Sequence, residues 1–280
     1  MLSVIEEEQA ALLTRVRGWH PGFEHWLLNY LEMPPVSPRV MLVDDPAAPH
    51  VLLMLEGGRF RLMGKEEHWP VVVADLFARN FEPPDVWPDE KAREIWQEQG
   101  RECLVLGGVG HKPIQLALQA GFEDDPEERD RAGAYFYWLT GAPRFAQMVK
   151  HPCRVVNAGL ELYELMRQAI DYDEEGEYTR KCLEQGPSFV CEVEGEPVCW
   201  SCTHLGGTMG MIFTPEKHRR RGFAKSLAAF QINYMLETTG HATCHVMEWN
   251  EASQRMVALF GMNRFNEPMI RRTLFWPEEG

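Results

Sequence analysis

A basic turn that contains glycine and opens an amphipathic helix is the stretch of this sequence best suited to chemistry. Residues 209–214 are largely apolar, Pro215 breaks the pattern, and Arg219-Arg-Arg-Gly222-Phe-Ala224 leads into the helix. The amino-terminal end of a helix presents unpaired N–H groups and the positive end of the helix dipole, and small residues there let a phosphate approach the backbone. The pattern predicts a strand, a loop and a helix that together hold a phosphorylated ligand.

Positive side chains gather at this turn in a chain that is otherwise acidic, so a pyrophosphate is the ligand we expect. A solvated basic helix start would explain the arginines but not the small residues among them. The residues that we expect to contact the phosphates are Arg219, Arg220, Arg221, Gly222, Phe223, Ala224 and Lys225.

The overall composition indicates a globular protein that we expect in the cytoplasm. The chain has 280 residues, of which 45% are hydrophobic and 25% charged, which suits one large domain or two ordinary ones. Its 28 basic and 42 acidic residues give a formal net charge of -14, which disfavours binding to nucleic acid or to an anionic membrane. No apolar run is long enough to span a bilayer, and the opening residues do not resemble a signal peptide.

The seven cysteines do not indicate a disulfide framework, because they are odd in number and scattered. Cys199 and Cys202 match the C-x-x-C spacing, but we place them on a strand, where residues three apart point to opposite faces. A shared metal or a vicinal dithiol would need a turn there, so we expect no metal.

The elements that must position the basic turn follow from the apolar periodicity and the breaks after residue 152. Helices are predicted at 159–171 and 177–184, and strands at 189–193, 198–203 and 209–213. A helix from Gly222 to about 237, a strand at 243–249, a helix from Asn250 to about 260 and a strand at 269–276 follow.

The first half of the chain also reads as an α/β unit. One or two helices precede Pro34-Pro35, and strands are predicted at 40–43, 51–55, 60–62, 103–106 and 135–139, with helices at about 67–80, 89–99 and 113–121. Gly108-x-Gly110 is interpreted as a tight strand-to-helix turn, because Pro113 stands where a dinucleotide-binding loop has its third glycine. Prolines between 141 and 152 mark a boundary, so we predict domains at 1–145 and 153–280.

The order α-α-β-β-β-α-β-α-β, with Arg-x-x-Gly-x-Ala after the third strand, resembles the GNAT superfamily of acyl-CoA N-acyltransferases. Within it, the glycine N-acyltransferase group is similar through Glu194-Gly-Glu-Pro-Val-Cys-Trp200, Pro215-Glu216 and Asn250-Glu-Ala. Such proteins also carry an amino-terminal half that is a degenerate copy of the same fold. The resemblance therefore implies a mixed α/β, tandem GNAT-like fold, with the degenerate copy at 1–145 and a complete GNAT domain at 153–280.

The same resemblance implies what the site binds. The basic turn would hold the pyrophosphate of coenzyme A, and the edge of the preceding strand would pair with the pantetheine arm. Asn250 would reach the pantetheine, although an N-cap at Asn250 or Ser253 is also expected on structural grounds. The further candidate CoA contacts are Ile212, Phe213, Thr214, Asn250 and Ser253.

The catalytic positions of the family differ in this chain. Where GNAT enzymes often have a proton-donating Tyr, this sequence has Val257, and where glycine acyltransferases have a Glu it has Gly207 or Thr208. Acyl transfer from a thioester still needs a neutral amine and a destination for its proton. His204 and Glu248, each near the end of a predicted strand, are the candidate replacements, and a water-mediated route without a side-chain base stays open.

The functional hypothesis is a cytoplasmic N-acyltransferase, in the first place an acetyltransferase, that moves an acyl group from acyl-CoA directly to a primary amine of a small molecule or amino acid. A ternary complex is implied, since no nucleophile stands out; Cys202 or Cys244 could act as a covalent relay but has no paired base in the sequence. The alternatives are a catalytically silent CoA-binding or regulatory protein and a purely structural module. The acceptor is not indicated by the residues.

Overall fold

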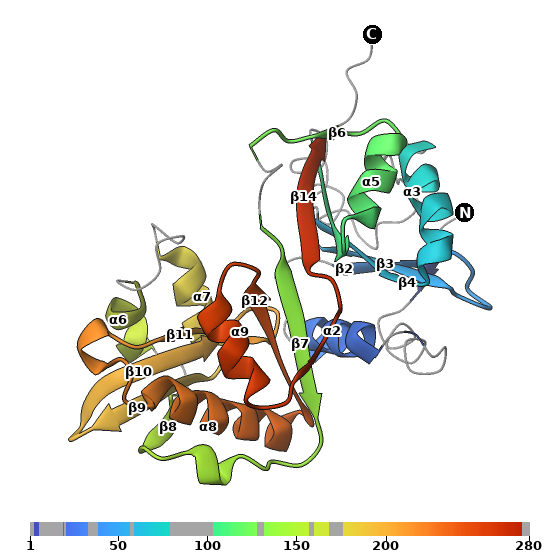
Figure 1. The fold of residues 1–280 in the computed structure, drawn as a ribbon. Helices are drawn as coiled ribbons and strands as arrows, with labels where there is room; N and C mark the ends of the chain where they lie inside the picture. The colour runs from blue at the N-terminus through green and yellow to red at the C-terminus, as the bar shows by residue number, and fades with distance from the viewer. Residues whose placement is uncertain are drawn as a thin grey trace. The chain divides into compact units, whose positions relative to one another are not determined.

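A computed structural model of the chain describes residues 3–5, 19, 21–32, 39–56, 59–78, 103–127, 132–156, 160–167 and 176–275 (Figure 1). The chain divides into two compact units. The first comprises Met1–Tyr135, Met247–Trp249 and Phe265–Gly280, and the second comprises Phe136–Val246 and Asn250–Arg264. The predicted domain division at 145 and 153 stays a prediction. None of the helices in these described ranges is both long and apolar enough to cross a membrane.

The first unit is a mixed sheet with helices packed on it. Its strands run in the order β1-β2-β3-β4-β5-β14, antiparallel except for the parallel pair β4 and β5. The strands are β1 (Ser3–Ile5), β2 (Arg39–Val43), β3 (Val51–Glu56), β4 (Arg59–Gly64), β5 (Cys103–Val109), β6 (Glu123–Asp124) and β14 (Met269–Phe275). The helices are α2 (Pro21–Glu32), η1 (Glu66–His68), α3 (Trp69–Ala78) and α5 (Lys112–Gln119).

The predicted strands of this unit are confirmed, with one correction. The strand predicted at 103–106 continues through Gly107 and Gly108 to Val109, because it pairs along its whole length with β14. The turn to α5 comes at Gly110, whose φ is 71°, so the interpretation as a strand-to-helix turn is confirmed. The predicted helix at 89–99 lies outside the described residues. Of the one or two helices predicted before Pro34, α2 is confirmed, whereas Ser3–Ile5 form a strand that pairs with β2.

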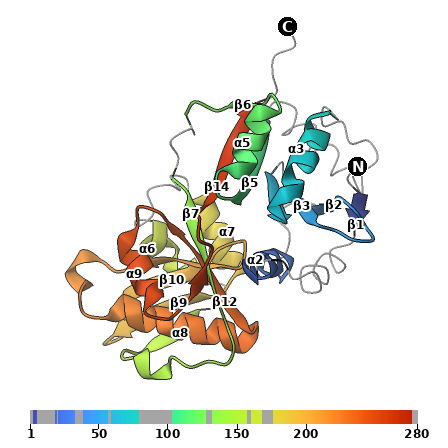
Figure 2. The same ribbon diagram turned by 45° about the vertical axis from the view of Figure 1, so that its right-hand side comes forward.

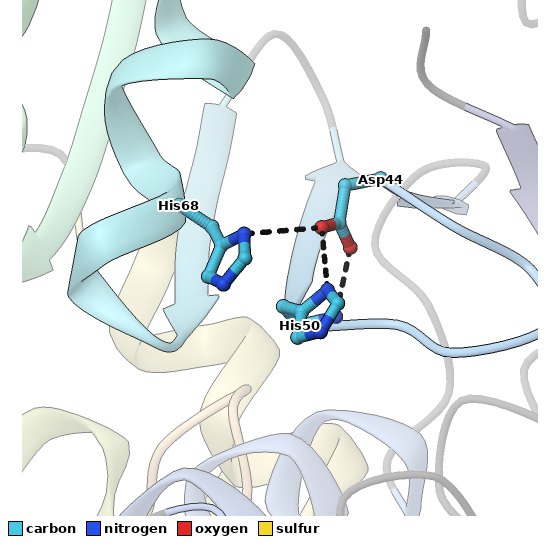
Figure 3. Close-up of side chains that lie close together, drawn as sticks. All are labelled: Asp44, His50 and His68. Carbon is cyan, nitrogen blue, oxygen red and sulfur yellow. Dashed lines mark hydrogen bonds and ion pairs between the residues drawn. The ribbon is translucent and has the colours of Figure 1, made fainter.

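The connection between β2 and β3 is closed by a carboxylate. Oδ1 of Asp44, one residue after β2, accepts a hydrogen bond from the backbone N–H of His50 (2.8 Å; Figure 3) and another from that of Val51 (3.0 Å). A short polar side chain that satisfies backbone donors in this way holds a turn in one conformation. The other carboxylate oxygen of Asp44 faces His50 and His68.

The second unit is built around a sheet in the order β8-β9-β10-β11-β12-β7 (Figures 1 and 2). The ladders from β8 to β11 are antiparallel and β11 is parallel to β12. The strands are β7 (Ala134–Thr140), β8 (Cys153–Val156), β9 (Ser188–Val193), β10 (Glu196–Thr203), β11 (Met209–Phe213), β12 (His241–Met247) and β13 (Asn263–Arg264). The helices are η2 (Ala146–Met148), η3 (Leu160–Leu162), α6 (Tyr163–Arg167), α7 (Glu177–Gln185), η4 (Glu216–His218), α8 (Phe223–Thr238) and α9 (Glu251–Ala258).

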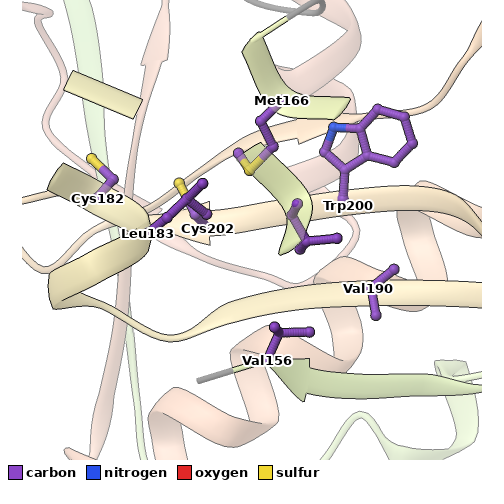
Figure 4. Packing of buried hydrophobic residues seen from close by; sticks show 8 residues of the cluster. Val156, Met166, Cys182, Leu183, Val190, Trp200 and Cys202 are labelled. Atoms are coloured by element: carbon purple, nitrogen blue, oxygen red, sulfur yellow. The ribbon is translucent and has the colours of Figure 1, made fainter. Parts of the chain in front are cut away.

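Successive side chains of β9 and β10 point to opposite faces of this sheet, so a hydrophobic core forms on each face. Val190, Trp200 and Cys202 pack with residues of α6 and α7, and Figure 4 shows this cluster with Met166, Cys182 and Leu183. Phe189, Cys191 and Cys199 pack on the other face with Phe223 and Leu227 of α8. Cys199 and Cys202 therefore point to opposite faces, as expected from their spacing.

Each half of the sequence contributes one strand to the unit formed mainly by the other half. Strand β7 comes before residue 141 but pairs next to β12 in the second unit, whereas β14, near the end of the chain, pairs with β5 in the first unit. Among the described residues, the order of elements from β2 to β7 matches the order from β9 to β14: three strands, a helix, a strand, a helix and a strand, with β6 and β13 as extra two-residue strands. That residues 1–145 are a degenerate copy of the later domain stays a prediction.

Candidate functional site

The parallel strands β11 and β12 meet at one position only. The register joins Met209 to Cys244, whereas β11 continues along β10 as far as the pair Trp200 and Phe213. Within the part of the chain that the structure describes, the edge of β11 from Gly210 onward is therefore not used by the ladder to β12. Two parallel strands that separate in this way leave backbone N–H and C=O groups along one edge.

A bulge in β11 lies in this separated stretch. The register with β10 shifts between Trp200 and Cys202, and Met211 has a φ of 52°, which is unusual for a residue with a side chain. A bulge leaves one residue out of the ladder and turns neighbouring backbone groups to a new direction. Ile212 and Phe213, two of the predicted contacts of the pantetheine arm, directly follow it.

The basic turn after β11 is held by one of its own arginines. Arg219 donates from Nε to the backbone oxygen of Thr214 (3.0 Å), and its guanidinium lies 5.9 Å from the ring centre of Phe213. Arg219 thus closes the loop across η4. Arg220 and Arg221 are exposed, and the guanidinium of Arg221 lies 5.0 Å from the ring centre of Phe223.

The backbone of the turn has two left-handed positions directly before a helix. Arg220 and Gly222 have φ angles of 61° and 85°, in the left-handed region, and Gly222 is the N-cap of α8. The N–H of Ser226 reaches the oxygen of Gly222 at 3.0 Å, so the N–H groups of the preceding first-turn residues have no acceptor within the helix. Left-handed residues beside such donors direct several N–H groups toward one point.

Two residues that the sequence analysis missed support this turn. Oγ of Ser226, a fully buried residue, accepts hydrogen bonds from the backbone N–H groups of Lys150 (2.8 Å) and His151 (3.0 Å). The ring of His151 packs 4.4 Å from that of Phe223, and its Nε2 lies 3.2 Å from the backbone oxygen of Arg221. The segment that we interpreted as a linker therefore holds the start of α8. The polar Ser226 within the apolar run of α8 is the sequence signal that could have indicated this contact.

His204 has a side-chain partner and a close backbone neighbour. Its Nδ1 lies 2.9 Å from the hydroxyl of Tyr178 on α7. The edge of the ring that carries Nε2 occupies the space that a side chain at Gly210 would fill. His204 thus lies against β11, one residue before its bulge. Gly207 and Thr208, which hold no titratable group, form the turn between His204 and β11.

Neither candidate relay cysteine is an activated thiol, whereas the pKa of Cys182, which contacts Cys202 and His204, is lowered. A hydrogen bond with Cys202 lowers the pKa of Cys182, and contacts with His204 and Tyr178 lower it further against the effect of burial. The same contact and burial raise the pKa of Cys202 well above its ordinary range. Burial alone raises the pKa of Cys244 to about 12. Cys202 and Cys244, the two candidate relays, are therefore neutral thiols at neutral pH.

Glu248, the second candidate base, is hydrogen-bonded to the backbone of Gly133 in the first unit. Oε2 of Glu248 accepts a hydrogen bond from the N–H of Gly133 (2.6 Å), and the N–H of Glu248 donates to the oxygen of Gly133 (3.1 Å). This reciprocal pair fixes the segment after β12 to the segment before β7. The arrangement gives Glu248 a structural role, which its sequence position did not reveal.

Asn250 caps α9, as expected on structural grounds. Its Oδ1 accepts a hydrogen bond from the N–H of Ser253 at 3.0 Å. Ser253 thus contributes its backbone to the cap rather than acting as the cap. Val257, at the position where GNAT enzymes often have a Tyr, is 3% exposed and supplies no proton donor.

Comparison with known proteins extends the resemblance found in the sequence. Residues 190–267 match the model of the FR47-like protein family. Human glycine N-acyltransferase-like protein 1 (Homo sapiens) is 31% identical over 86 residues, which are 30% of this chain. The match spans 28% of that relative's own length.

Two solved structures match nearly the whole chain. A Drosophila protein has a TM-score of 0.61 at 14% identity, with 99% of each chain covered. A tandem GNAT protein from the clavulanic acid biosynthesis pathway has a TM-score of 0.56 at 14% identity, with 99% of this chain and 97% of that chain covered. The predicted mixed α/β fold and the resemblance to GNAT proteins are both confirmed.

Proposed function

We propose that this GNAT-fold chain is an acyl-CoA-dependent N-acyltransferase that moves an acyl group, acetyl in the first place, directly to a primary amine of a small molecule or amino acid. The observation that carries the proposal is the combination of two features at β11. Its edge separates from β12 after Met209, and the strand ends in a basic turn with left-handed residues at Arg220 and Gly222.

The turn suits the pyrophosphate of coenzyme A. Free N–H groups at the start of α8 supply hydrogen bonds to phosphate oxygens, and the helix dipole adds positive potential. Arg220, Arg221 and Lys225 are exposed there and carry the compensating charges. Arg219 acts differently: bound to Thr214, it shapes the loop. The corresponding connection of the first unit, between β4 and α3, has Glu66 and Glu67 in place of a run of arginines, and Glu66 pairs with Lys112 (3.1 Å).

The free edge of β11 suits the pantetheine arm. An extended chain with amide groups can pair with an unpaired strand edge as an additional strand would. The bulge at Met211 would end that pairing where the thioester carbonyl must lie, since the residues on either side of a bulge turn in different directions. The gap between β11 and β12 then admits the amine.

In the proposed reaction the neutral amine attacks the thioester carbonyl carbon. The C–N bond forms, the C–S bond breaks, coenzyme A leaves as the thiolate, and the amine proton must reach a base or water. Holding the two reactants together supplies much of the rate, so no covalent enzyme intermediate is needed. We assign the proton acceptor to His204, because it lies against β11 and its Nδ1 contacts the hydroxyl of Tyr178. Tyr178 can pass the proton onward.

The acceptor class is inferred from the chemistry and from the name of the human relative. A glycine N-acyltransferase-like protein suggests an amino acid or a related small amine. We propose no metal in this reaction, because proton transfer and thiolate departure need none.

Transfer is tested by incubating the full chain with acetyl-CoA and short-chain acyl-CoA donors against a panel of amino acids and small amines. Acylated product is measured by mass spectrometry, since the protein's own thiols would disturb a thiol reagent. We expect product only when the enzyme is present. His204→Gln should lower kcat/KM at least about 100-fold, the lower end of the range for loss of a general base.

Glu248→Gln is the matched control, because a Gln oxygen can still accept the hydrogen bond from Gly133. It should retain wild-type activity. Binding of coenzyme A without any product would support a catalytically silent binding protein, an alternative that the buried Val257 favours. Absence of both binding and product would overturn the proposal.

A further inference from the structure

Three potential metal ligands meet at the loop between β2 and β3 of the first unit, and none of them belongs to the proposed coenzyme A site. Asp44 follows β2, His50 precedes β3, and His68 ends η1 just before α3. Nδ1 of His50 lies 3.2 Å from Oδ2 of Asp44, and Nδ1 of His68 lies 3.9 Å from the same atom (Figure 3). One ligand atom from each residue lies within 4.8 Å of the other two.

The carboxylate is already held in position, but the two imidazoles are not yet aimed at a single ion. Their rings stack with centres 4.0 Å apart and planes inclined by 5°, so the in-plane lone pairs of the two Nδ1 atoms run nearly parallel, and one ring must turn before both can bind the same ion (Figure 3). The other oxygen of Asp44 is occupied by the backbone N–H groups of His50 and Val51. Such outer hydrogen bonds hold a ligating carboxylate in place and leave one oxygen for the ion.

Hydrogen bonds alone do not account for the arrangement of Asp44, His50 and His68. The distance from His68 to Asp44, 3.9 Å, is too long for a hydrogen bond, yet the ring is held parallel to that of His50. An ion bound by Asp44, His50 and His68 together would account for the nearness of all three side chains.

We propose that Asp44, His50 and His68 form a binding site for a divalent transition-metal ion, with Zn²⁺ as the ion that suits it best. Two imidazole nitrogens and one carboxylate oxygen are a common zinc set, with a fourth position open to water. Tetrahedral ligands about 2.0–2.1 Å from zinc lie roughly 3.3–3.5 Å from one another, so the ligand atoms, which now lie within 4.8 Å of one another, must draw closer, and one imidazole must turn toward the ion.

The surroundings permit a water ligand and give the ion a structural task. The side chains of Asp44, His50 and His68 are 17%, 35% and 37% exposed, so the cluster is reachable from solvent but is not a loose surface group. A bound ion would add a second link between the β2–β3 loop and η1, beside the hydrogen bond from the backbone N–H of Lys65 to the backbone oxygen of His50 (2.8 Å). Mg²⁺, which prefers oxygen ligands and regular octahedral geometry, should bind poorly.

Metal-depleted full-length protein is titrated with Zn²⁺ by calorimetry, and its thermal unfolding is measured with and without the ion. We expect one equivalent to bind and to raise the unfolding temperature. His68→Ala should weaken zinc binding at least about tenfold, since even loss of an outer-shell partner costs 10- to 100-fold. His68 is the residue to change first, because Asp44 also holds the loop. His111→Ala, an exposed histidine of the same unit, is the control.

Co²⁺ then identifies the ligands, because thiolate coordination adds strong near-ultraviolet absorption that imidazole and carboxylate do not. The site would be supported by visible Co²⁺ bands without the near-ultraviolet thiolate absorption. These bands should be lost in His68→Ala and His50→Ala and kept in His111→Ala. Equal zinc affinity in wild type and His68→Ala would overturn it, as would thiolate absorption, which would assign the ion to cysteines. Circular dichroism of the metal-free variants shows whether each one is folded.

Discussion

At the scale of single residues, the basic turn depends on two left-handed positions of different kinds. Gly222 adopts its φ of 85° at no steric cost, whereas Arg220 adopts 61° against the preference of every residue that carries a Cβ. Strained backbone of this kind persists where the surroundings enforce it and concentrates at binding sites. Here Arg219, Ser226 and His151 enforce it through hydrogen bonds to or around the loop.

Gly222→Ala tests whether the backbone of the turn, and not only its charge, binds coenzyme A. A Cβ at Gly222 would meet no protein atom closer than 3.8 Å, so the left-handed conformation sets the cost. We expect the unfolding free energy to fall by about 1–2 kcal/mol and affinity for coenzyme A, measured by calorimetry, to fall at least tenfold, about 1.4 kcal/mol.

Gly240→Ala is the matched control at the other end of α8. Its φ is 77°, and no atom lies within 4 Å of a Cβ there. It should cost similar stability and leave the affinity for coenzyme A unchanged. If both variants lost affinity equally, the effect would come from the helix as a whole and not from the turn.

At the scale of elements, α9 is held at its start by Asn250, and this cap competes with the proposed contact to pantetheine. Asn250→Ala should lower the unfolding free energy by about 1 kcal/mol, because it leaves the N–H of Ser253 without its acceptor. Asn250→Ser keeps a capping oxygen but removes the amide, so it should keep most of the stability. Denaturant unfolding measures both effects.

The same two variants separate the roles of Asn250 in binding. If the amide also donates to the ligand, both should bind coenzyme A about fivefold more weakly, the effect of one hydrogen bond worth about 1 kcal/mol. Wild-type affinity in Asn250→Ser would limit Asn250 to the cap.

Elements with a local signal were predictable from the sequence. The strands that became β2, β3 and β4 show apolar runs between turn residues, and β11 begins and ends at the predicted residues. Strand β8 was missed, because four residues after a proline carry too little pattern, and its place is set by pairing with β9. The basic turn was also predictable, because its arginines and small residues stand together in the sequence.

The support of the site was not predictable, because it comes from distant residues. His151 and Ser226 are 75 positions apart, and Tyr178 and His204 are 26 positions apart. Such contacts exist only once the sheet has formed. The structural bond between Glu248 and Gly133 spans 115 positions, so a lone acidic residue at the end of a strand could not reveal it.

At the scale of the whole molecule, the exchange of β7 and β14 means that a cut between the two predicted domains separates strands from their partners. A fragment 153–280 would lack β7, the neighbour of β12, and would carry β14 without β5. A fragment 1–145 would have the converse defect. Neither sheet would be complete.

We therefore expect each fragment produced alone to unfold without cooperativity or to aggregate, and the two produced together to form a one-to-one complex. Size-exclusion chromatography and circular dichroism check this. As a control, full-length protein cleaved after folding at a protease site placed in the exposed segment 141–144 should stay associated. A well-dispersed NMR spectrum from 153–280 alone would contradict the expectation.

The separation of β11 from β12 also bears on how the protein behaves at high concentration. An unpaired strand edge invites a strand from a neighbouring molecule, and such attachment begins aggregation. The bulge at Met211 interrupts the regular spacing of N–H and C=O groups that a foreign strand would need along 210–213. The irregularity at Met211 would therefore also hinder the joining of separate copies of the chain through this edge.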